Sequence, residues 1–124
     1  MRVFKTRPFV RFAEREDISD KALCEAVGRA EAGRADADLG GGVIKQRIAR
    51  PGQGKSGGFR SIVLFRRGTK AFFVYGFAKS DRDNIRIDEL KAFRKLAEQM
   101  LGLSDDAIAA AIRNGTITEI MCHG

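Results

Sequence analysis

The side chains in this sequence that are best suited to chemistry are cations, and they are concentrated in the middle of the chain. Residues 43–82 contain ten basic side chains and one acidic side chain, although the net charge of the whole chain is only +7. Arginine binds phosphate oxygens through parallel N–H donors, and lysine binds them as a point charge. This segment therefore indicates an anionic partner such as nucleic acid. The alternative is that these cations protect strand edges from pairing with other chains.

Cations alone can assist the cleavage of RNA, because RNA carries its own nucleophile. The 2′-OH attacks the adjacent phosphate, and an enzyme accelerates this step by accepting the 2′-OH proton, stabilising the charged phosphorane and protonating the leaving 5′-oxygen. Arginine suits the second role. A lysine whose pKa is lowered by neighbouring cations can act as the base or the acid. This route requires no metal ion or other cofactor, so we expect none.

Several other kinds of site lack the residues that they need. One histidine, His123, and two cysteines, Cys24 and Cys122, are too few for a structural metal site, and the histidine is poorly placed for a Ser-His-Asp triad. We also expect no disulfide framework from two isolated cysteines. The segment Gly54-Lys-Ser56 resembles the start of a phosphate-binding loop, but a strand follows where that motif requires a helix. Nucleotide hydrolysis is therefore not expected.

The length and composition indicate one domain over residues 1–124 with its own hydrophobic core. Hydrophobic residues make up 44% of the sequence, which is enough to form that core. No run of about 18 apolar residues is present to span a membrane, and the N-terminal residues lack the apolar stretch of a signal peptide. We therefore expect a soluble, cytoplasmic protein.

The hydrophobic periodicity predicts a small α+β domain, in which helices pack on an antiparallel or mixed sheet. A strand over 2–6 precedes two helices, the first with Pro8 in its first turn and the second capped by Ser19. Residues 39–42 are predicted to form a turn, 43–49 a strand with one basic side, and 51–58 a flexible loop. The most apolar segments, 59–65 and 70–78, are predicted to form a central hairpin covered on both faces. Two C-terminal helices, over 85–101 and after the Ser104 cap, and a strand over 116–122 complete the domain.

The middle of the sequence contains a pattern that is typical of a known family. Gly54-Lys-Ser-Gly-Gly-Phe-Arg60 leads into an apolar strand and Arg-Arg-Gly, and Phe73-Val-Tyr-Gly-Phe-Ala-Lys79 precedes Ser-Asp-Arg-Asp-Asn-Ile85. These residues resemble the RelE/ParE-type toxins of bacterial type II toxin–antitoxin systems, and in particular the HigB-like RelE branch. The resemblance covers roughly residues 3–120.

The resemblance implies a RelE-like fold and a toxin that enters the ribosomal decoding site and cuts messenger RNA there. It also implies a cognate antitoxin, often a helix-turn-helix protein, as a partner. Arg60 matches the arginine that stabilises the transition state, Lys79 matches the basic residue at the end of the following strand, and Lys55 lies where the family places residues that hold RNA or move protons. These three are the candidate catalytic residues. The candidate RNA- and phosphate-binding residues are Lys45, Arg47, Arg82, Tyr75 and Arg86.

The sequence departs from the usual family pattern at two positions. Ser80 stands where a further arginine is typical, and Arg86 lies near the place of a family tyrosine, while the only tyrosine, Tyr75, lies within a strand. The identity of the general base is therefore left open. Tyr75 can stack on a base or belong to the core, Arg60 can instead pair with a helix carboxylate, and Lys79 can be a solvated strand end. The alternative function is a non-catalytic toxin or binding module that acts on another target such as DNA gyrase, as ParE-like toxins do.

Overall fold

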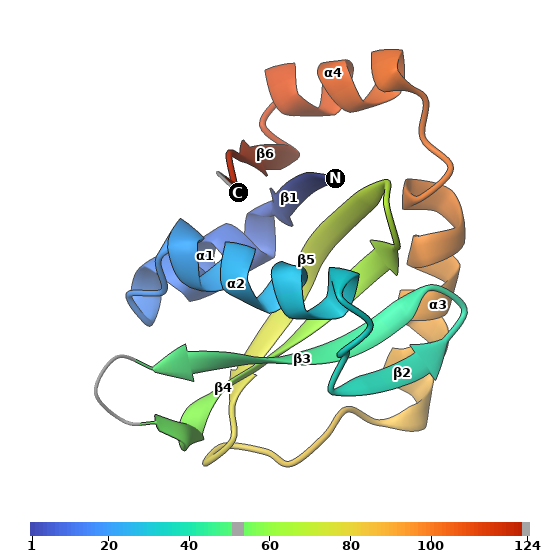
Figure 1. Cartoon of the computed structure of the whole chain (residues 1–124). Coiled ribbons are helices and arrows are strands. Elements are labelled where there is room, and N and C mark those ends of the chain that lie inside the picture. The colour runs from blue at the N-terminus through green and yellow to red at the C-terminus, as the bar shows by residue number, and fades with distance from the viewer. Residues whose placement is uncertain (51–53, 123–124) are drawn as a thin grey trace.

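The computed structural model describes residues 1–50 and 54–122, with the side chains of 1–49 and 58–122, and is built on one mixed sheet (Figure 1). The strands of these residues are β1 (Arg2–Thr6), β2 (Ala37–Gly40), β3 (Val43–Arg50), β4 (Gly54–Arg66), β5 (Lys70–Ala78) and β6 (Ile117–Ile120). Their order across the sheet is β2-β3-β4-β5-β1-β6. Strands β1 and β5 are parallel, and the other neighbours are antiparallel. The predicted α+β fold class is confirmed.

Helices lie on both faces of this sheet. The helices are α1 (Arg7–Arg15), α2 (Asp20–Glu31), α3 (Ile87–Met100) and α4 (Asp105–Arg113). Helices α1 and α2 cover one face, α3 packs on the other, and α4 contacts β6 (Figure 1). The hydroxyls of Ser19 and Ser104 accept hydrogen bonds from the N–H groups of Ala22 and Ala107, both at 3.1 Å, so both predicted caps are present.

The helices on the two faces of the sheet enclose two hydrophobic cores. The central strand β4 contributes side chains to both of them. Phe59 and Val63 belong to the core beneath α1 and α2, whereas Ile62 and Leu64 belong to the core beneath α3 and α4. Successive side chains of a strand point to opposite faces, so an almost continuously apolar strand supplies both cores. The prediction of a central hairpin covered on both faces is confirmed.

Two of the predicted loops are shorter than expected. Residues 39–42 do not form only a turn, because β2 occupies Ala37–Gly40 and pairs with β3. The reversal is confined to Gly40, Gly41 and Gly42, which all have positive φ angles and so require glycine. Of the expected loop 51–58, residues 51–53 lie outside the described residues, whereas β4 already begins at Gly54 and pairs with Arg50. Backbone pairing with β3 extends the strand through this glycine-rich segment.

We expected no disulfide framework from the two cysteines, but they are joined to each other. Cys24 and Cys122 form a disulfide with a Cα–Cα distance of 5.6 Å across a sequence separation of 98. The physical reason is tertiary: Val3 packs in the same core as α2, and it pairs with Ile120 of β6. These contacts bring the end of β6 to the side of α2, a proximity that sequence spacing does not reveal.

Candidate nucleic-acid interface

Strand pairing places predicted site residues in one row across the sheet. Arg47 of β3 lies opposite Arg60 of β4, and Arg60 lies opposite Phe77 of β5. Directly opposed residues of antiparallel strands share a face, and Phe77 is buried in the core beneath α3. Arg47 and Arg60 therefore lie on the face of the sheet that carries α3.

A second row lies two residues further along these strands. Lys45 of β3 is opposite Ile62 of β4, and Ile62 is opposite Tyr75 of β5. Ile62 is fully buried in the core beneath α3, and Tyr75 packs against that core. Both rows therefore share one face. We call the exposed or half-exposed members of the two rows the basic face: Lys45, Arg47, Arg60 and Tyr75.

Arg60 makes few polar contacts within the protein. Among the described residues its one polar partner is the carbonyl of Phe59, to which Nη1 donates at 3.4 Å, and no carboxylate lies within ion-pair distance. The described residues thus do not provide the helix carboxylate that would neutralise Arg60. A guanidinium carries five N–H donors, so most of those on Arg60 remain for an external anion.

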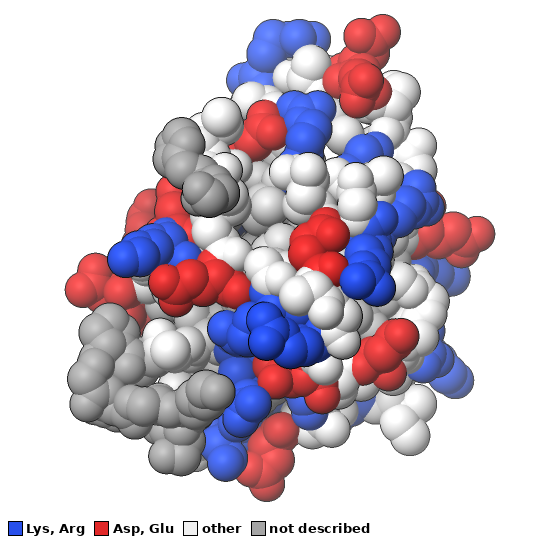
Figure 2. Space-filling view, in the orientation of Figure 1, with Lys and Arg blue, Asp and Glu red and all other residues white. Residues whose placement is uncertain are grey.

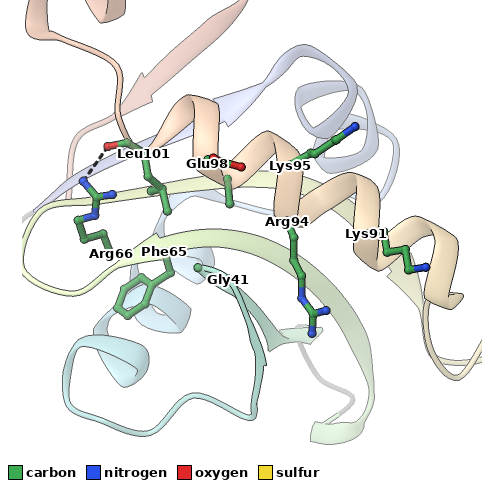
Figure 3. Close-up of a pocket in the computed structure, with 10 residues that line it drawn as sticks. Gly41, Phe65, Arg66, Lys91, Arg94, Lys95, Glu98 and Leu101 are labelled. Carbon is green, nitrogen blue, oxygen red and sulfur yellow. Dashed lines mark hydrogen bonds between the residues drawn. The ribbon is translucent and has the colours of Figure 1, made fainter.

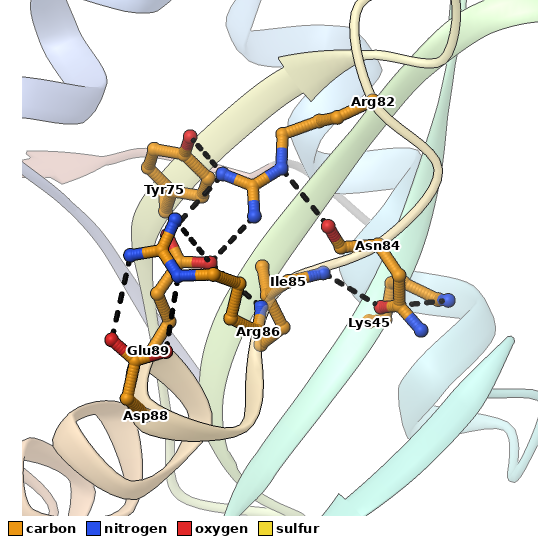
Figure 4. A network of polar contacts seen from close by, with 8 residues as sticks. All are labelled: Lys45, Tyr75, Arg82, Asn84, Ile85, Arg86, Asp88 and Glu89. Atoms are coloured by element: carbon orange, nitrogen blue, oxygen red, sulfur yellow. Dashed lines mark hydrogen bonds and ion pairs between the residues drawn. The ribbon is translucent and has the colours of Figure 1, made fainter.

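Arg82, in contrast, is occupied by protein contacts (Figure 4). Its guanidinium donates to the Tyr75 hydroxyl oxygen at 3.0 Å, to both carboxylate oxygens of Glu89 at 3.2 and 2.5 Å, and to the carbonyl of Asn84 at 2.9 Å. It also lies 5.7 Å from the centre of the Tyr75 ring. Because its donors point inward, Arg82 holds the loop before α3 and the tyrosine hydroxyl in place.

The Arg82 contacts shift the acid–base equilibria of the ion pair. The side-chain hydrogen bond from Arg82, followed by that from the Arg86 N–H, lowers the pKa of Glu89 from 4.5 to about 2. The hydrogen bond to Glu89 in turn raises the pKa of Arg82. Glu89 is therefore an anion throughout the physiological pH range, and Arg82 stays paired with it.

Lys45 and Arg86 lie on either side of the same loop (Figure 4). The Nζ atom of Lys45 is 3.4 Å from Oδ1 of Asn84, an exposed contact that an anion can displace. Arg86 donates from Nε to Asp88 at 3.0 Å, and its backbone N–H donates to Glu89 at 2.7 Å at the start of α3. Its side chain is 68% exposed and keeps most of its surface for solvent.

The other three predicted site residues differ in how the structure places them. Arg47 forms an ion pair with Asp36 at 3.1 Å, so its charge is partly neutralised. Lys79 is exposed in the turn after β5, two residues beyond Phe77, and has no hydrogen bond or ion pair within the described part of the chain. The side chain of Lys55 lies outside the described residues.

Sequence reasoning missed the residues that organise this region. Glu89 and Asn84 hold Arg82 and Lys45, and Phe77 supports the row that contains Arg60. A signal for Glu89 was present, because a glutamate three residues after a helix cap is typical of a helix start. Asn84 had no comparable signal, since its contact with Lys45 joins residues far apart in the sequence.

The surface on the other side of the sheet carries both signs of charge. Figure 2 shows that acidic and basic side chains are interspersed on the face that carries α1 and α2. No three His, Cys, Asp or Glu side chains come together among the described residues in a way that would hold a metal ion. None of the described helices is long and apolar enough to cross a membrane.

The fold and the basic face together define a small α+β protein with a cationic sheet surface suited to a polyanion. Residues 1–120 match the family model described as the RelE toxin of the RelE / RelB toxin-antitoxin system. The chain therefore belongs to the RelE toxin family: it is the toxin component of a toxin–antitoxin system, and its partner is an antitoxin. No curated protein matches its sequence.

Proposed function

We propose that this toxin is an endoribonuclease that cuts messenger RNA on the ribosome, and hence acts in the cytoplasm. The observation that carries the proposal is the state of Arg60: a half-exposed guanidinium on the basic face whose one polar partner among the described residues is a carbonyl. An arginine kept in the fold without a carboxylate partner is suited to bind an external anion. The phosphate at the cleavage position is that anion.

Each chemical role in the cleavage has a candidate residue. Arg60 binds the non-bridging oxygens and stabilises the negative charge of the phosphorane. Lys79, exposed next to the Arg60 row, and Lys55 are the candidates for proton transfer. Tyr75 uses its hydroxyl oxygen to accept from Arg82 and keeps its own proton to donate. The two-step proton movement, from the 2′-OH and to the 5′-oxygen, is divided among these three groups.

The test is a cleavage assay in a purified translation system, with primer extension to map the ends of the messenger RNA. We expect the wild type to produce cuts at in-frame positions. Arg60→Ala should abolish them, with a loss of at least about 100-fold, the scale for removal of one transition-state donor. Lys79→Ala should also reduce cleavage. The matched control is Arg113→Ala, an exposed arginine in the last turn of α4, which should cut at the wild-type rate.

Two results would count against the proposal. If Arg60→Ala, with an unchanged circular dichroism spectrum, cuts as fast as the wild type, Arg60 is not the transition-state cation. If the wild type leaves messenger RNA intact but traps DNA gyrase on DNA, the protein is a ParE-like toxin instead.

A further inference from the structure

A second cationic region lies away from the basic face, in a groove between α3 and the turn that joins β2 to β3 (Figure 3). The groove has a volume of about 650 Å³. Its floor is formed by Gly41, Gly42 and Ala97, and its lining includes four cations and one acid, Arg66, Lys91, Arg94, Lys95 and Glu98. None of these residues belongs to the site proposed above.

The glycine turn lets the backbone of the sheet approach α3 closely. A Cβ atom on Gly41 would lie 3.0 Å from Cγ of Arg94, and one on Gly42 would lie 2.8 Å from Cδ1 of Leu101. Both glycines also have positive φ angles, of 62° and 82°. The backbone of Gly41 and Gly42 therefore forms the floor of the groove, and the shape of the groove depends on glycine at both positions.

The arginines of the groove are anchored by backbone carbonyls rather than by carboxylates. Arg66 donates from Nη1 to the carbonyl of Leu101 at 2.9 Å, and Arg94 donates from Nε and Nη2 to the carbonyl of Leu39. A carbonyl fixes the position of a guanidinium but leaves its positive charge uncompensated. Each arginine also keeps further N–H donors.

The lysines of the groove add two uncompensated charges. Lys91 and Lys95 are exposed and lie one helical turn apart on the same side of α3. Neither forms an ion pair within the described part of the chain, although Glu98 lines the same groove. The groove thus presents a row of cations at a regular spacing along a helix.

We propose that this groove binds the phosphodiester backbone of RNA as a second contact surface of the toxin. This inference rests on the proposed function, because the RNA is the strand that the basic face would cut. Lys45 connects the two surfaces: it lies three residues after Gly42 on β3, which corresponds to about 10 Å along a strand. One strand of RNA held at the basic face can therefore continue past Lys45 and into the groove.

An RNA backbone fits the lining of the groove better than a protein segment does. Protein interfaces are centred on large apolar or aromatic anchors in pockets. Here the floor is glycine backbone and Ala97. Of the two large apolar side chains in the lining, Leu101 is only 4% exposed, and Phe65 packs against the core beneath α1 and α2. Rows of lysine point charges bind the phosphate backbone without reading its sequence.

The test is the salt dependence of RNA binding, measured by fluorescence anisotropy with a single-stranded 2′-O-methyl RNA oligonucleotide that cannot be cleaved. We expect Lys91→Ala/Lys95→Ala to weaken binding about tenfold at low salt, and to reduce the slope of log K against log salt by about 1.4, the value for two lost phosphate contacts on a single strand. The matched control is Lys21→Ala/Arg113→Ala, which removes two exposed cations from α2 and α4. It should keep the wild-type slope, and both variants should keep the wild-type melting temperature.

The outcomes separate this inference from the proposed function. If the Lys91→Ala/Lys95→Ala protein keeps the wild-type slope, the groove does not bind RNA and the inference is wrong, even if messenger RNA cleavage depends on Arg60 as expected. A wild type that shows no salt-dependent binding of the oligonucleotide overturns it too. If the slope of the double variant falls as expected but the wild type cuts no messenger RNA, RNA binding by the groove is supported and the proposed function is wrong. If the double variant loses only antitoxin affinity, the groove is a protein-binding surface and the inference is wrong.

Discussion

Opening the disulfide between Cys24 and Cys122 should destabilise this toxin more than any single surface substitution. The bond joins α2 to the residue two positions after β6 and spans 98 residues of sequence. Cross-linking a chain over such a span removes conformational freedom from the denatured state, by about 4.7 kcal/mol for a loop of about 100 residues in the chain-entropy model. Since small domains have a total stability of about 5–15 kcal/mol, this contribution is a large part of the whole.

The measurement is urea denaturation of the oxidised wild type, the same protein with a reductant, and Cys24→Ser/Cys122→Ser. For an m value of about 2 kcal/mol/M, the loss corresponds to a midpoint lower by about 2 M urea. Cys122 is exposed and Cys24 is only partly buried, so neither serine leaves a large cavity, and the effect should come from the denatured state. The double variant should be insensitive to reductant, which is the control for effects of the reagent itself.

Two results would contradict the prediction about the disulfide. If the folded, air-oxidised wild type has two free thiols by mass spectrometry after alkylation, the bond does not form. If the bond is present but the midpoint is the same with and without reductant, the constraint on the denatured chain contributes nothing. In a reducing compartment, where such bonds are rare, the pair would be held as thiols and the less stable form would be the working one.

Three further predictions concern the ion pair beside the basic face and the packing of two glycines. Because the pKa of Glu89 is lowered from 4.5 to about 2, its stabilisation is complete above pH 4.5 and is lost as the pH falls to about 2. The difference between the urea midpoints of the wild type and Glu89→Gln should therefore become smaller as the pH falls over that interval. A difference that stays constant would contradict the pairing with Arg82. Gly76→Ala should destabilise the protein by about 1–3 kcal/mol, because a Cβ there would lie 2.2 Å from the Phe12 ring. Gly28→Ala, in α2 with nothing within 4 Å, should instead stabilise it by about 0.5–1 kcal/mol in the same assay.

Local patterns in the sequence were sufficient for much of the fold. The serine caps, the proline at the start of α1 and the two apolar strands of the hairpin each depend on residues close in sequence, and all are present. Strand β2 was missed because it is a short edge strand, defined by pairing with β3 and not by its own pattern. The disulfide was missed for the same reason, since it depends on the packing of segments 98 residues apart.

The candidate site shows the same division between local and non-local information. Alternation along β3 predicted that its basic residues share a side, and strand register then aligned Arg47 with Arg60. Residue type alone could not distinguish a cation used within the protein from one kept for a ligand. Arg82 and Arg60 are both arginines of the basic segment. Among the described residues, however, Arg82 has a bidentate carboxylate partner and Arg60 has a single carbonyl.

This difference changes the role that we assign to Arg82. A guanidinium that already donates to Glu89, Tyr75 and Asn84 cannot bind a phosphate strongly without giving up those contacts. If the protein cuts RNA as proposed, we expect Arg82 to act indirectly, by fixing the Tyr75 hydroxyl and the loop in which Asn84 contacts Lys45. The same loop leads into α3, whose later turns carry the lysines of the groove. We therefore expect the Arg82–Glu89 pair to fix the position of the groove relative to the basic face, so that a single RNA strand would have to match this arrangement to contact both.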